Sequence, residues 1–408
     1  MIFPLTRPIV LVMVGLPARG KTYLARKMTR YLTWHGHKAE VFNVGNYRRE
    51  RLGADQPAAF FDPSNPDGRA AREMVAEAAL DDVIRWVAQG GDVAVYDATN
   101  STRERRDRVR KRLAEAGIEP ILVESLTTDP AIVEANIRET KLSSPDYKDR
   151  GGSDAIADFR ARIAFYEAAY EEVSDAEGPY VKVIDVGRKI IAHRISGYLP
   201  AQIVSYLSNL HVRPRPIYLT RHGESEYNPQ GRIGGDPDLT SRGMAYVSRL
   251  SPFLTSELAE AGEPPQVWCS TLKRAMTTAG ALPWQAVSLR SLDEIDAGSC
   301  DGWTYAEVEA RLPDDATMRS ADKLRYRYPR GESYQDVILR VQPVVVEIER
   351  QRAPVVIVAH NAVIRVLYGY FAGFMPEQVP RIEIPLHTVI RIVPKTYAAE
   401  ETRFNLGP

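Results

Sequence analysis

The stretch Gly15-Leu16-Pro17-Ala18-Arg19-Gly20-Lys21-Thr22 has the spacing of a phosphate-binding loop, with two glycines followed by a lysine and a hydroxyl residue. It follows the apolar run Ile9–Val14, which predicts a strand, and it precedes a segment of helical spacing at 21–31. Backbone N–H groups wrap phosphate oxygens in such a loop, and the helix dipole favours negative charge there. We therefore expect Lys21 to bridge the terminal phosphates of a nucleotide and Thr22 to ligate magnesium. A chance glycine-rich turn is the alternative, which the flanking strand and helix disfavour.

Asp97 follows the apolar run Val93–Tyr96, where a fold of this kind places its second magnesium-associated acid. Taken alone, an aspartate at a strand end is more often a cap or turn residue, but the phosphate-binding loop upstream favours metal and nucleophile positioning. Arginines cluster at 103–106 and at Arg48-Arg49, and guanidinium groups bind phosphate bidentately. We expect an acceptor that already carries a phosphate. Three further basic residues are interpreted as a solvated helix face: Arg108, Lys111 and Arg112.

A second chemical centre is expected in the C-terminal half, where Arg221 and His222 follow the apolar run Ile217–Thr220. A strand would deliver both side chains to one edge of a sheet. Imidazole accepts a phosphoryl group near neutral pH, and a neighbouring arginine neutralises the oxygens of that group. Arg274 and His360 also follow apolar runs, so the sequence predicts a phosphate pocket with His222 as nucleophile.

Glu294 is the candidate general acid for the leaving alcohol and afterwards the base for water. A lone carboxylate is more often structural, so its neighbours must decide between the two interpretations. Four isolated histidines are given no role: His35, His37, His193 and His211.

The length of 408 residues favours two domains. Apolar runs at 39–44, 121–123 and 181–186 alternate with helical stretches, which predicts an α/β fold with a mainly parallel sheet in the first half. Helical spacing at 158–173 and 190–207 predicts helices that close this domain. Pro214 and Pro216 mark the connection, so we expect domains at 1–212 and 213–408, with the second in the same α/β style.

The composition limits the class of partner. Lys plus Arg and Asp plus Glu both total 53, so no net charge attracts the chain to nucleic acid or to a membrane surface. The first apolar run is too short to span a bilayer, and no secretion signal is visible. Two cysteines, Cys269 and Cys300, are too few for a disulfide framework. These features favour a cytoplasmic protein with small-molecule substrates.

The chain contains, in this order, the motifs GLPARGKTY, FNVGNYRRE, VYDATNSTRERR, KLSSPDY, RHGES, GRIGGDP, EIDAG and RYRYPRGESY. They resemble the bifunctional 6-phosphofructo-2-kinase/fructose-2,6-bisphosphatase family, and the resemblance extends from Pro8 to about Val393. It implies an N-terminal P-loop kinase domain and a C-terminal histidine-phosphatase domain of the phosphoglycerate-mutase-like α/β type. It further implies that ATP with Mg²⁺ phosphorylates fructose 6-phosphate at the 2-hydroxyl. The product would be hydrolysed through a phosphohistidine, and the chain would form a homodimer.

The resemblance also implies site residues. The ATP site would comprise Gly15, Ala18, Arg19, Gly20, Lys21, Thr22, Tyr23, Asn136 and Lys141, with Lys21, Asp97 and Lys141 catalytic and Thr22 and Asp97 at the metal. Fructose 6-phosphate in the kinase would be held by Arg48, Arg72, Thr99, Arg105, Lys141, Arg162 and Tyr166. In the phosphatase the catalytic set would be His222, Glu294, His360, Arg221 and Arg274. Fructose 2,6-bisphosphate would contact Arg221, Asn228, Gly234, Arg274, Tyr305, Arg319, Lys323, Tyr334, Asn361 and Arg365.

The chain departs from the family pattern at several places. Thr127 stands where the family has a cysteine, which makes thiol-dependent behaviour unexpected, and Asn361 replaces a glutamine, which would alter the grip on product. The chain is short beside the animal enzymes, so phosphorylation control of their kind is not expected. Two rivals remain: a sensor with inactive centres, and an enzyme for another phosphorylated acceptor such as a nucleic-acid end, which the neutral charge disfavours.

Overall fold

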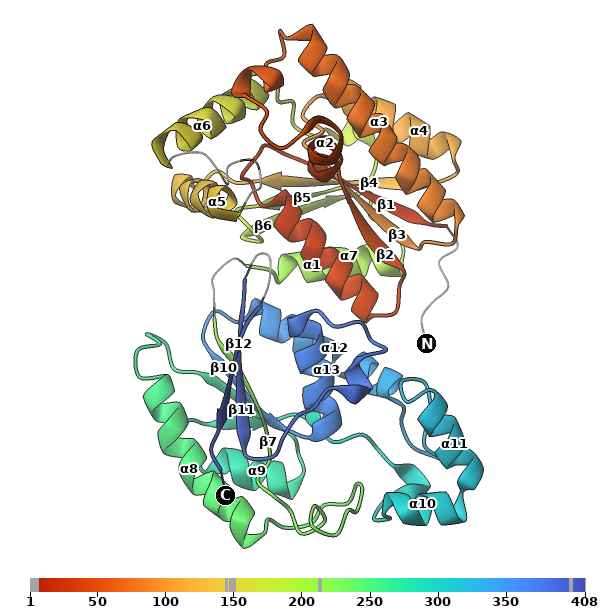
Figure 1. The fold of residues 1–408 in the computed structure, drawn as a ribbon, viewed down its shortest axis with the longest axis vertical. Helices are drawn as coiled ribbons and strands as arrows, with labels where there is room; N and C mark the ends of the chain where they lie inside the picture. Colours follow the sequence, from red (N-terminus) through yellow and green to blue (C-terminus); the bar gives the residue numbers. More distant parts are fainter. Residues whose placement is uncertain (1–6, 144–145, 147–151, 212–214, 396–398, 408) are drawn as a thin grey trace. The chain divides into compact units, whose positions relative to one another are not determined.

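The computed structural model describes residues 7–143, 146, 152–211, 215–395 and 399–407. The chain folds into two units, Met1–Leu210 and His211–Pro408. Each unit has its own six-stranded sheet, and each is described by itself (Figure 1). Among the described residues, no helix has both the length and the apolarity needed to cross a bilayer.

The N-terminal unit is built on a sheet with the strand order β2-β3-β1-β4-β5-β6, in which only β6 is antiparallel to its neighbour. Its strands are β1 Ile9–Val14, β2 Ala39–Asn43, β3 Val93–Asp97, β4 Glu119–Leu126, β5 Tyr180–Ile184 and β6 Lys189–His193. Its helices are α1 Lys21–Trp34, α2 Val44–Leu52, α3 Pro66–Ala88, α4 Arg103–Glu115, α5 Pro130–Ser143, α6 Gly152–Ala168 and α7 Tyr198–Ser208. The mainly parallel sheet predicted from the sequence is confirmed.

The core of this unit explains the continuous apolar character of the central strands. Every residue of β1 is buried, as expected for a strand covered on both faces. Val10, Val12 and Val14 pack in one cluster with residues of α3 and α4, including Leu80 and Val109. Figure 1 shows α3 and α4 on one face of the sheet and α1 and α7 on the other. The carboxyl ends of β1 and β3 are thereby fixed side by side, because these strands pair in parallel.

The predicted helix at 190–207 is wrong in its first part. Residues 189–193 form β6, which pairs antiparallel with β5 so that Ile191 lies opposite Lys182, and the helix begins only at Tyr198. The adjacent β-branched residues Ile190 and Ile191 favour a strand, and a tight turn containing Gly187 at φ 84° returns the chain to the sheet. The helix expected at 158–173 instead occupies 152–168.

The C-terminal unit has the strand order β12-β11-β7-β10-β8-β9, with the antiparallel strands β11 and β12 at one edge. Its strands are β7 Ile217–Arg221, β8 Gln266–Cys269, β9 Ala286–Ser288, β10 Val355–Ala359, β11 Thr388–Pro394 and β12 Ala399–Asn405. Its helices are α8 Ser241–Glu257, α9 Lys273–Gly280, α10 Tyr305–Arg311, α11 Pro313–Ala321, α12 Tyr334–Arg350 and α13 Asn361–Ala372. Since β7, β10 and β8 are parallel neighbours, the residues that follow them meet at one edge of the sheet.

Candidate active sites

The loop at 15–22 joins β1 to α1, and residues at the end of β4 pack against it. Gly15 has φ 137°, and a Cβ atom there would lie 2.5 Å from the carbonyl oxygen of Ser125, so no other residue fits without displacement of the backbone. The hydroxyl groups of Ser125 and Thr127 donate to the carbonyl of Arg19, Thr127 at 3.5 Å. Thr127 therefore contacts the loop from the same side as Ser125.

Lys21 is the first residue of α1 and is buried beside this loop. Its Nζ donates to the carbonyl of Leu16 at 2.6 Å. Burial lowers the pKa of Lys21 to about 8; the charge of Asp97 opposes this shift, and the charges of Arg19 and Arg162 add to it. The ammonium group therefore stays mostly protonated at neutral pH. The negative charge of a bound phosphate would offset the hydration that this group loses through burial.

Thr22 and Asp97 lie together, as the two predicted metal-site residues should. The Thr22 hydroxyl donates to Oδ2 of Asp97 at 2.8 Å, and Asn43 Nδ2 donates to the same oxygen at 2.5 Å. A hydroxyl and a carboxylate are oxygen donors that suit Mg²⁺, which also uses substrate phosphates and water. The residues therefore fit a magnesium–nucleotide complex. Asn43 was not predicted; it accepts a hydrogen bond from the backbone of Asn46 and so caps α2.

The structure describes most of the other residues that were predicted to bind the nucleotide. Asn136 donates from Nδ2 to the carbonyl of Ala18 at 3.0 Å and so contacts the phosphate-binding loop. Arg19 pairs with Glu167 at 3.0 Å. Tyr23 lies in the first turn of α1. Lys141 lies in α5, but its side chain is outside the described part of the structure.

A cavity of about 200 Å³ lies beside β3 and α4. Four of the residues predicted to hold the acceptor sugar line it: Arg72, Thr99, Arg105 and Tyr166. Burial lowers the pKa of Arg72, and the charges of Arg105 and Arg162 add to that effect. Four arginines and three glutamates line the pocket, so positive charge is in slight excess, which suits a phosphorylated acceptor.

Arg48 and Arg162, the other two predicted acceptor residues with described side chains, converge on Asp146. Arg48 Nη2 donates to Asp146 Oδ2 at 2.6 Å, and Arg162 Nη1 lies 3.4 Å from the same oxygen. The guanidinium of Arg162 also stacks on the ring of Phe61, with 3.6 Å from its carbon to the ring centroid. Asp146 and Phe61 were not predicted, because neither residue type indicates a phosphate site by itself.

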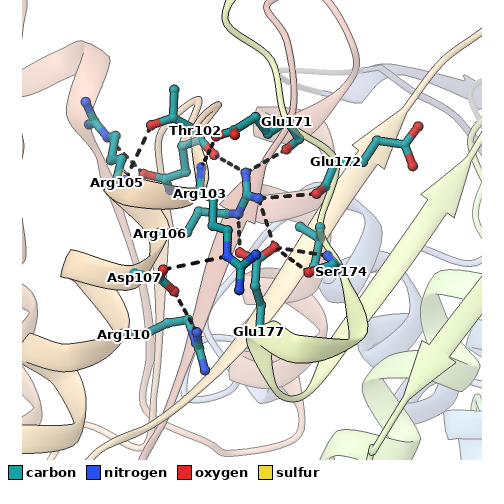
Figure 2. A network of polar contacts seen from close by, with 12 residues as sticks. Thr102, Arg103, Arg105, Arg106, Asp107, Arg110, Glu171, Glu172, Ser174 and Glu177 are labelled. Carbon is teal, nitrogen blue, oxygen red and sulfur yellow. Dashed lines mark hydrogen bonds and ion pairs between the residues drawn. The ribbon is translucent and has the colours of Figure 1, made fainter.

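The arginine cluster at 103–106 divides by environment. Arg105 lines the cavity, whereas Arg103 pairs with Asp107 at the surface, 3.8 Å away. Arg106 is fully buried in an ion pair with Glu177, shown in Figure 2. Of the arginines in this cluster, Arg105 alone was expected to bind the acceptor, and it is the one that lines the cavity.

The C-terminal unit brings His222, Arg274 and His360 together at the edge formed by β7, β8 and β10. The imidazole rings of His222 and His360 lie 4.9 Å apart between centroids, and Arg274 Nε donates to His222 Nε2 at 3.1 Å. All three side chains are buried. The geometry therefore unites groups that are far apart in the sequence.

The tautomer of His222 follows from its two partners. Its Nδ1 lies 2.6 Å from the carbonyl of Gly223, which only accepts, so Nδ1 carries the proton. Nε2 then bears the lone pair that receives the Arg274 hydrogen bond. Burial lowers the pKa of His222 well below its ordinary value, and the charges of Arg274 and Arg221 add to this shift. A neutral imidazole whose Nε2 is unprotonated is the form that attacks phosphorus.

His360 is oriented by residues that the sequence did not indicate. Its Nε2 lies 2.7 Å from Ser270 Oγ, and that hydroxyl donates to Asp293 Oδ1 at 2.8 Å. Since the serine proton is engaged with the carboxylate, His360 donates from Nε2. The pKa of His360 is lowered well below the ordinary value by burial, followed by electrostatic interactions with the His222 ring and with Arg274.

Glu294 lies in the loop before α10 and faces the start of α13. Its Oε1 accepts from the backbone N–H of Ala362 at 3.1 Å and from that of Ile295 at 2.9 Å. Arg340 donates to the carbonyls of Ser291 and Asp293 at 2.8 and 2.7 Å and so anchors this loop. The charge of Glu294 opposes the lowering of the Arg221 pKa, so the two lie in one electrostatic environment.

A second cationic group lies in the same unit. Arg319 Nε donates to Tyr328 at 2.9 Å and its Nη2 to Tyr305 at 3.2 Å, while Arg365 Nη1 donates to Tyr334 at 3.0 Å. Burial lowers the pKa of Lys323 to about 8, with the charges of Arg365 and Arg319 adding to the effect. Five residues predicted to contact fructose 2,6-bisphosphate therefore lie close together: Tyr305, Arg319, Lys323, Tyr334 and Arg365.

Three remaining predicted residues have distinct settings. Asn228 accepts from the backbone N–H of Ser225 at 2.8 Å and shapes the loop after His222. Gly234 has φ 70°, which strains other residues, and a Cβ atom there would also lie 1.7 Å from Asp301 Oδ1. Asn361 begins α13, and its Oδ1 is buried without a hydrogen-bond partner among the described residues.

Comparisons with known proteins match the two parts of the chain to two different families. The family model for 6-phosphofructo-2-kinase matches residues 4–214, and that for the histidine phosphatase superfamily (branch 1) matches residues 217–406. The 6-phosphofructo-2-kinase/fructose-2,6-bisphosphatase of Arabidopsis thaliana is 48% identical over 98% of this chain and 54% of its own length. The Homo sapiens protein with the same name and the number 3 is 46% identical over 96% of this chain and 75% of its own length.

The chain thus spans about half the length of the plant relative. Among solved structures, the alpha-ribazole phosphatase of Shigella flexneri is 22% identical, with a TM-score of 0.42 over 47% of this chain and 96% of that chain. The two family models together account for nearly the whole sequence. The chain belongs to the 6-phosphofructo-2-kinase/fructose-2,6-bisphosphatase family and carries both of its enzymatic domains in one polypeptide.

Proposed function

We propose that this chain itself performs both reactions of its family, with the kinase in residues 1–212 and the phosphatase in residues 213–408. The kinase moves the γ-phosphoryl group of ATP to the 2-hydroxyl of fructose 6-phosphate, and the phosphatase removes that group. The observation that carries the proposal is that each unit gathers the groups of one reaction. One unit brings His222 together with Arg274 and His360. The other has Lys21 under the electrostatic influence of Asp97 and a cavity lined in part by arginines.

In the kinase, the loop at 15–22 and Lys21 hold the terminal phosphates, and Arg72 and Arg105 hold the phosphate of the acceptor sugar. Thr22 and Asp97 would hold the magnesium ion, which neutralises charge on the nucleotide phosphates. Both described hydrogen bonds to Asp97 reach Oδ2, so Oδ1 is the oxygen left for this task or for the acceptor hydroxyl. Phosphoryl transfer needs little covalent help, and positioning with charge neutralisation accounts for most of the catalysis.

In the phosphatase, His222 Nε2 attacks the phosphorus of the 2-phosphate, and the bond between phosphorus and the sugar oxygen breaks. Glu294 gives a proton to that oxygen, and fructose 6-phosphate leaves. Glu294 then takes a proton from water, whose oxygen attacks the phosphohistidine, and the nitrogen–phosphorus bond breaks to release phosphate and free His222. Arg221 and Arg274 neutralise the oxygens of the transferring group.

Two substitutions test the assignment of two separate centres. Lys21→Met removes the buried cation and is expected to abolish synthesis of fructose 2,6-bisphosphate while its hydrolysis continues. His222→Ala is expected to abolish hydrolysis while synthesis continues. This variant should also form no labelled phosphohistidine when it is incubated with fructose 2,6-bisphosphate labelled at the 2-phosphate. A variant that lost both activities together, with an unchanged unfolding temperature, would contradict the proposal. If the protein were a sensor with inactive centres, the unaltered chain would show neither activity.

The finer assignments follow from the same proposal. We place the protein in the cytoplasm, because both cysteines are free and buried, which suits a reducing compartment. We also propose that the chain forms a homodimer, on the strength of the family resemblance alone. Light scattering of the purified chain measures its mass directly, and a mass of one chain at micromolar concentration would contradict the dimer.

A further inference from the structure

Asn100 occupies an unusual position in the loop between β3 and α4. The residue is fully buried, and its φ of 45° lies in the left-handed region that asparagine tolerates better than most residues. Its side chain is satisfied on both sides. Nδ2 donates to the carbonyl of Met13 in β1 at 2.7 Å, and Oδ1 accepts from Arg105 Nε at 3.1 Å.

The same loop is bonded to the start of the phosphate-binding loop. The carbonyl of Thr99 accepts from the backbone N–H of Gly15 at 2.9 Å. Thr99 and Arg105 both line the acceptor cavity, and Asn100 stands between them in the sequence. One asparagine therefore fixes the guanidinium of Arg105 relative to the strand that carries the nucleotide loop.

A buried ion pair holds the backbone of this loop from the other side. Arg106 pairs with Glu177 through Nε at 2.6 Å and Nη2 at 2.9 Å, and its Nη1 donates to the carbonyls of Asn100 and Glu171 at 3.2 and 2.8 Å. Figure 2 shows the Arg106 guanidinium among Glu171, Glu172 and Glu177, and the Arg105 side chain outside that group. With its charge balanced by Glu177, Arg106 has no role in binding an anion.

We infer that Asn100 is a positioning residue of the kinase centre, which acts through Arg105, and that the Arg106–Glu177 pair fixes the loop on which both depend. The inference rests on the proposed role of Arg105 in binding the acceptor phosphate. Transfer requires the acceptor hydroxyl to stand in line with the terminal phosphate of the nucleotide. A misplacement of about 1 Å is sufficient to cost about 100-fold in rate. An arginine fork held at Nε presents its remaining N–H groups in one orientation.

The test is a double-mutant cycle between Asn100 and Arg105 in the full chain. Asn100→Gly keeps the left-handed backbone and removes both side-chain hydrogen bonds. We expect the KM for fructose 6-phosphate to rise about tenfold, as for the loss of a hydrogen bond to a charged group, and the KM for ATP to stay the same. Arg105→Ala should raise the KM for fructose 6-phosphate by at least as much. In that background, Asn100→Gly should add nothing.

A second pair of variants tests whether the Arg106–Glu177 ion pair fixes the loop between β3 and α4. Arg106→Lys loses the bidentate pairing with Glu177 and should also raise the KM for fructose 6-phosphate. Arg110→Lys is the matched control, because Arg110 lies on the same helix and its one ion pair among the described residues is with Asp107, 2.9 Å away. That control should leave both KM values unchanged, and hydrolysis of fructose 2,6-bisphosphate should be unchanged in every variant.

The outcomes separate the inference from the proposed function. If Arg105→Ala leaves the KM for fructose 6-phosphate unchanged, the assignment of Arg105 fails. If Arg105→Ala raises it but the two substitutions multiply in the double variant, Asn100 does not act through Arg105 and the inference is overturned. A rise of the KM for ATP equal to that for fructose 6-phosphate in Asn100→Gly also overturns it, since Asn100 would then support the unit as a whole.

Discussion

Acidification should destabilise the C-terminal unit through its two active-site imidazoles. The pKa of His222 and that of His360 lie well below the ordinary value of 6.5 because both rings are buried beside guanidinium groups. The unfolded chain takes up protons as the pH falls through 6.5, whereas the folded unit does not. Stability from this source is therefore fully present above that pH and is lost as the pH falls toward the lowered values.

The magnitude follows from the ordinary histidine pKa. Between about pH 7.0 and about pH 5.5, each imidazole that stays neutral in the folded state costs about 1.3 kcal/mol of unfolding free energy, so the two together cost about 2.5 kcal/mol. Carboxylates contribute little in this window, because their pKa values in the unfolded chain are near 4. Burial also lowers the pKa of His211 to about 4, so His211 adds a loss of about the same size as each active-site imidazole, and the lowered pKa of His387 acts in the same direction.

Hydrogen exchange in urea measures this effect in the intact chain. Peptides from β7 and β10 report the opening of the C-terminal unit, with rates corrected for the intrinsic pH dependence of exchange. Replacing His222 and His360 together by Asn should remove about 2.5 kcal/mol of the pH dependence. If the double variant kept the whole dependence, or if the unaltered chain showed none, the assignment of neutral buried imidazoles would be refuted.

Two further substitutions test single contacts. Ser270→Ala removes the hydroxyl that joins His360 to Asp293; we expect kcat for hydrolysis to fall about tenfold, with the KM and the kinase rate unchanged in steady-state assays, and an unchanged kcat would contradict the orienting role. Gly15→Ala places a Cβ atom 2.5 Å from a backbone carbonyl, so calorimetry should show the affinity for ATP reduced at least 100-fold because the loop must move; hydrolysis serves as the internal control, and normal ATP affinity would show that the loop is not the nucleotide site.

The sequence predicted best what depends on local pattern. The buried strands β1 and β10 are continuous apolar runs, and the phosphate-binding loop has fixed spacing with a strand before it and a helix after it. The prediction of a helix at 190–207 failed, because Ile190 and Ile191 fit both the apolar period of a helix and the residue preference of a strand. Only the pairing with β5 decides between them. Tertiary context outweighed the local pattern there.

The parts of the sites that were missed are neutral or structural residues far along the chain from their partners. Ser270 is separated by 90 positions from His360, and Asn43 by 54 positions from Asp97. Neither serine nor asparagine indicates catalysis by its type. Their roles arise from the arrangement of strand ends, which a single sequence does not contain.

The hydrogen bond from Arg274 to His222 has a consequence for selectivity. In the resting site the reactive nitrogen is already capped by the enzyme's own guanidinium, so an uncharged electrophile that diffuses in meets an occupied lone pair. A phosphate ester would differ, because its oxygens would compete with the ring for the N–H groups of Arg274. The negative charge of such a substrate would then release the Nε2 lone pair of His222.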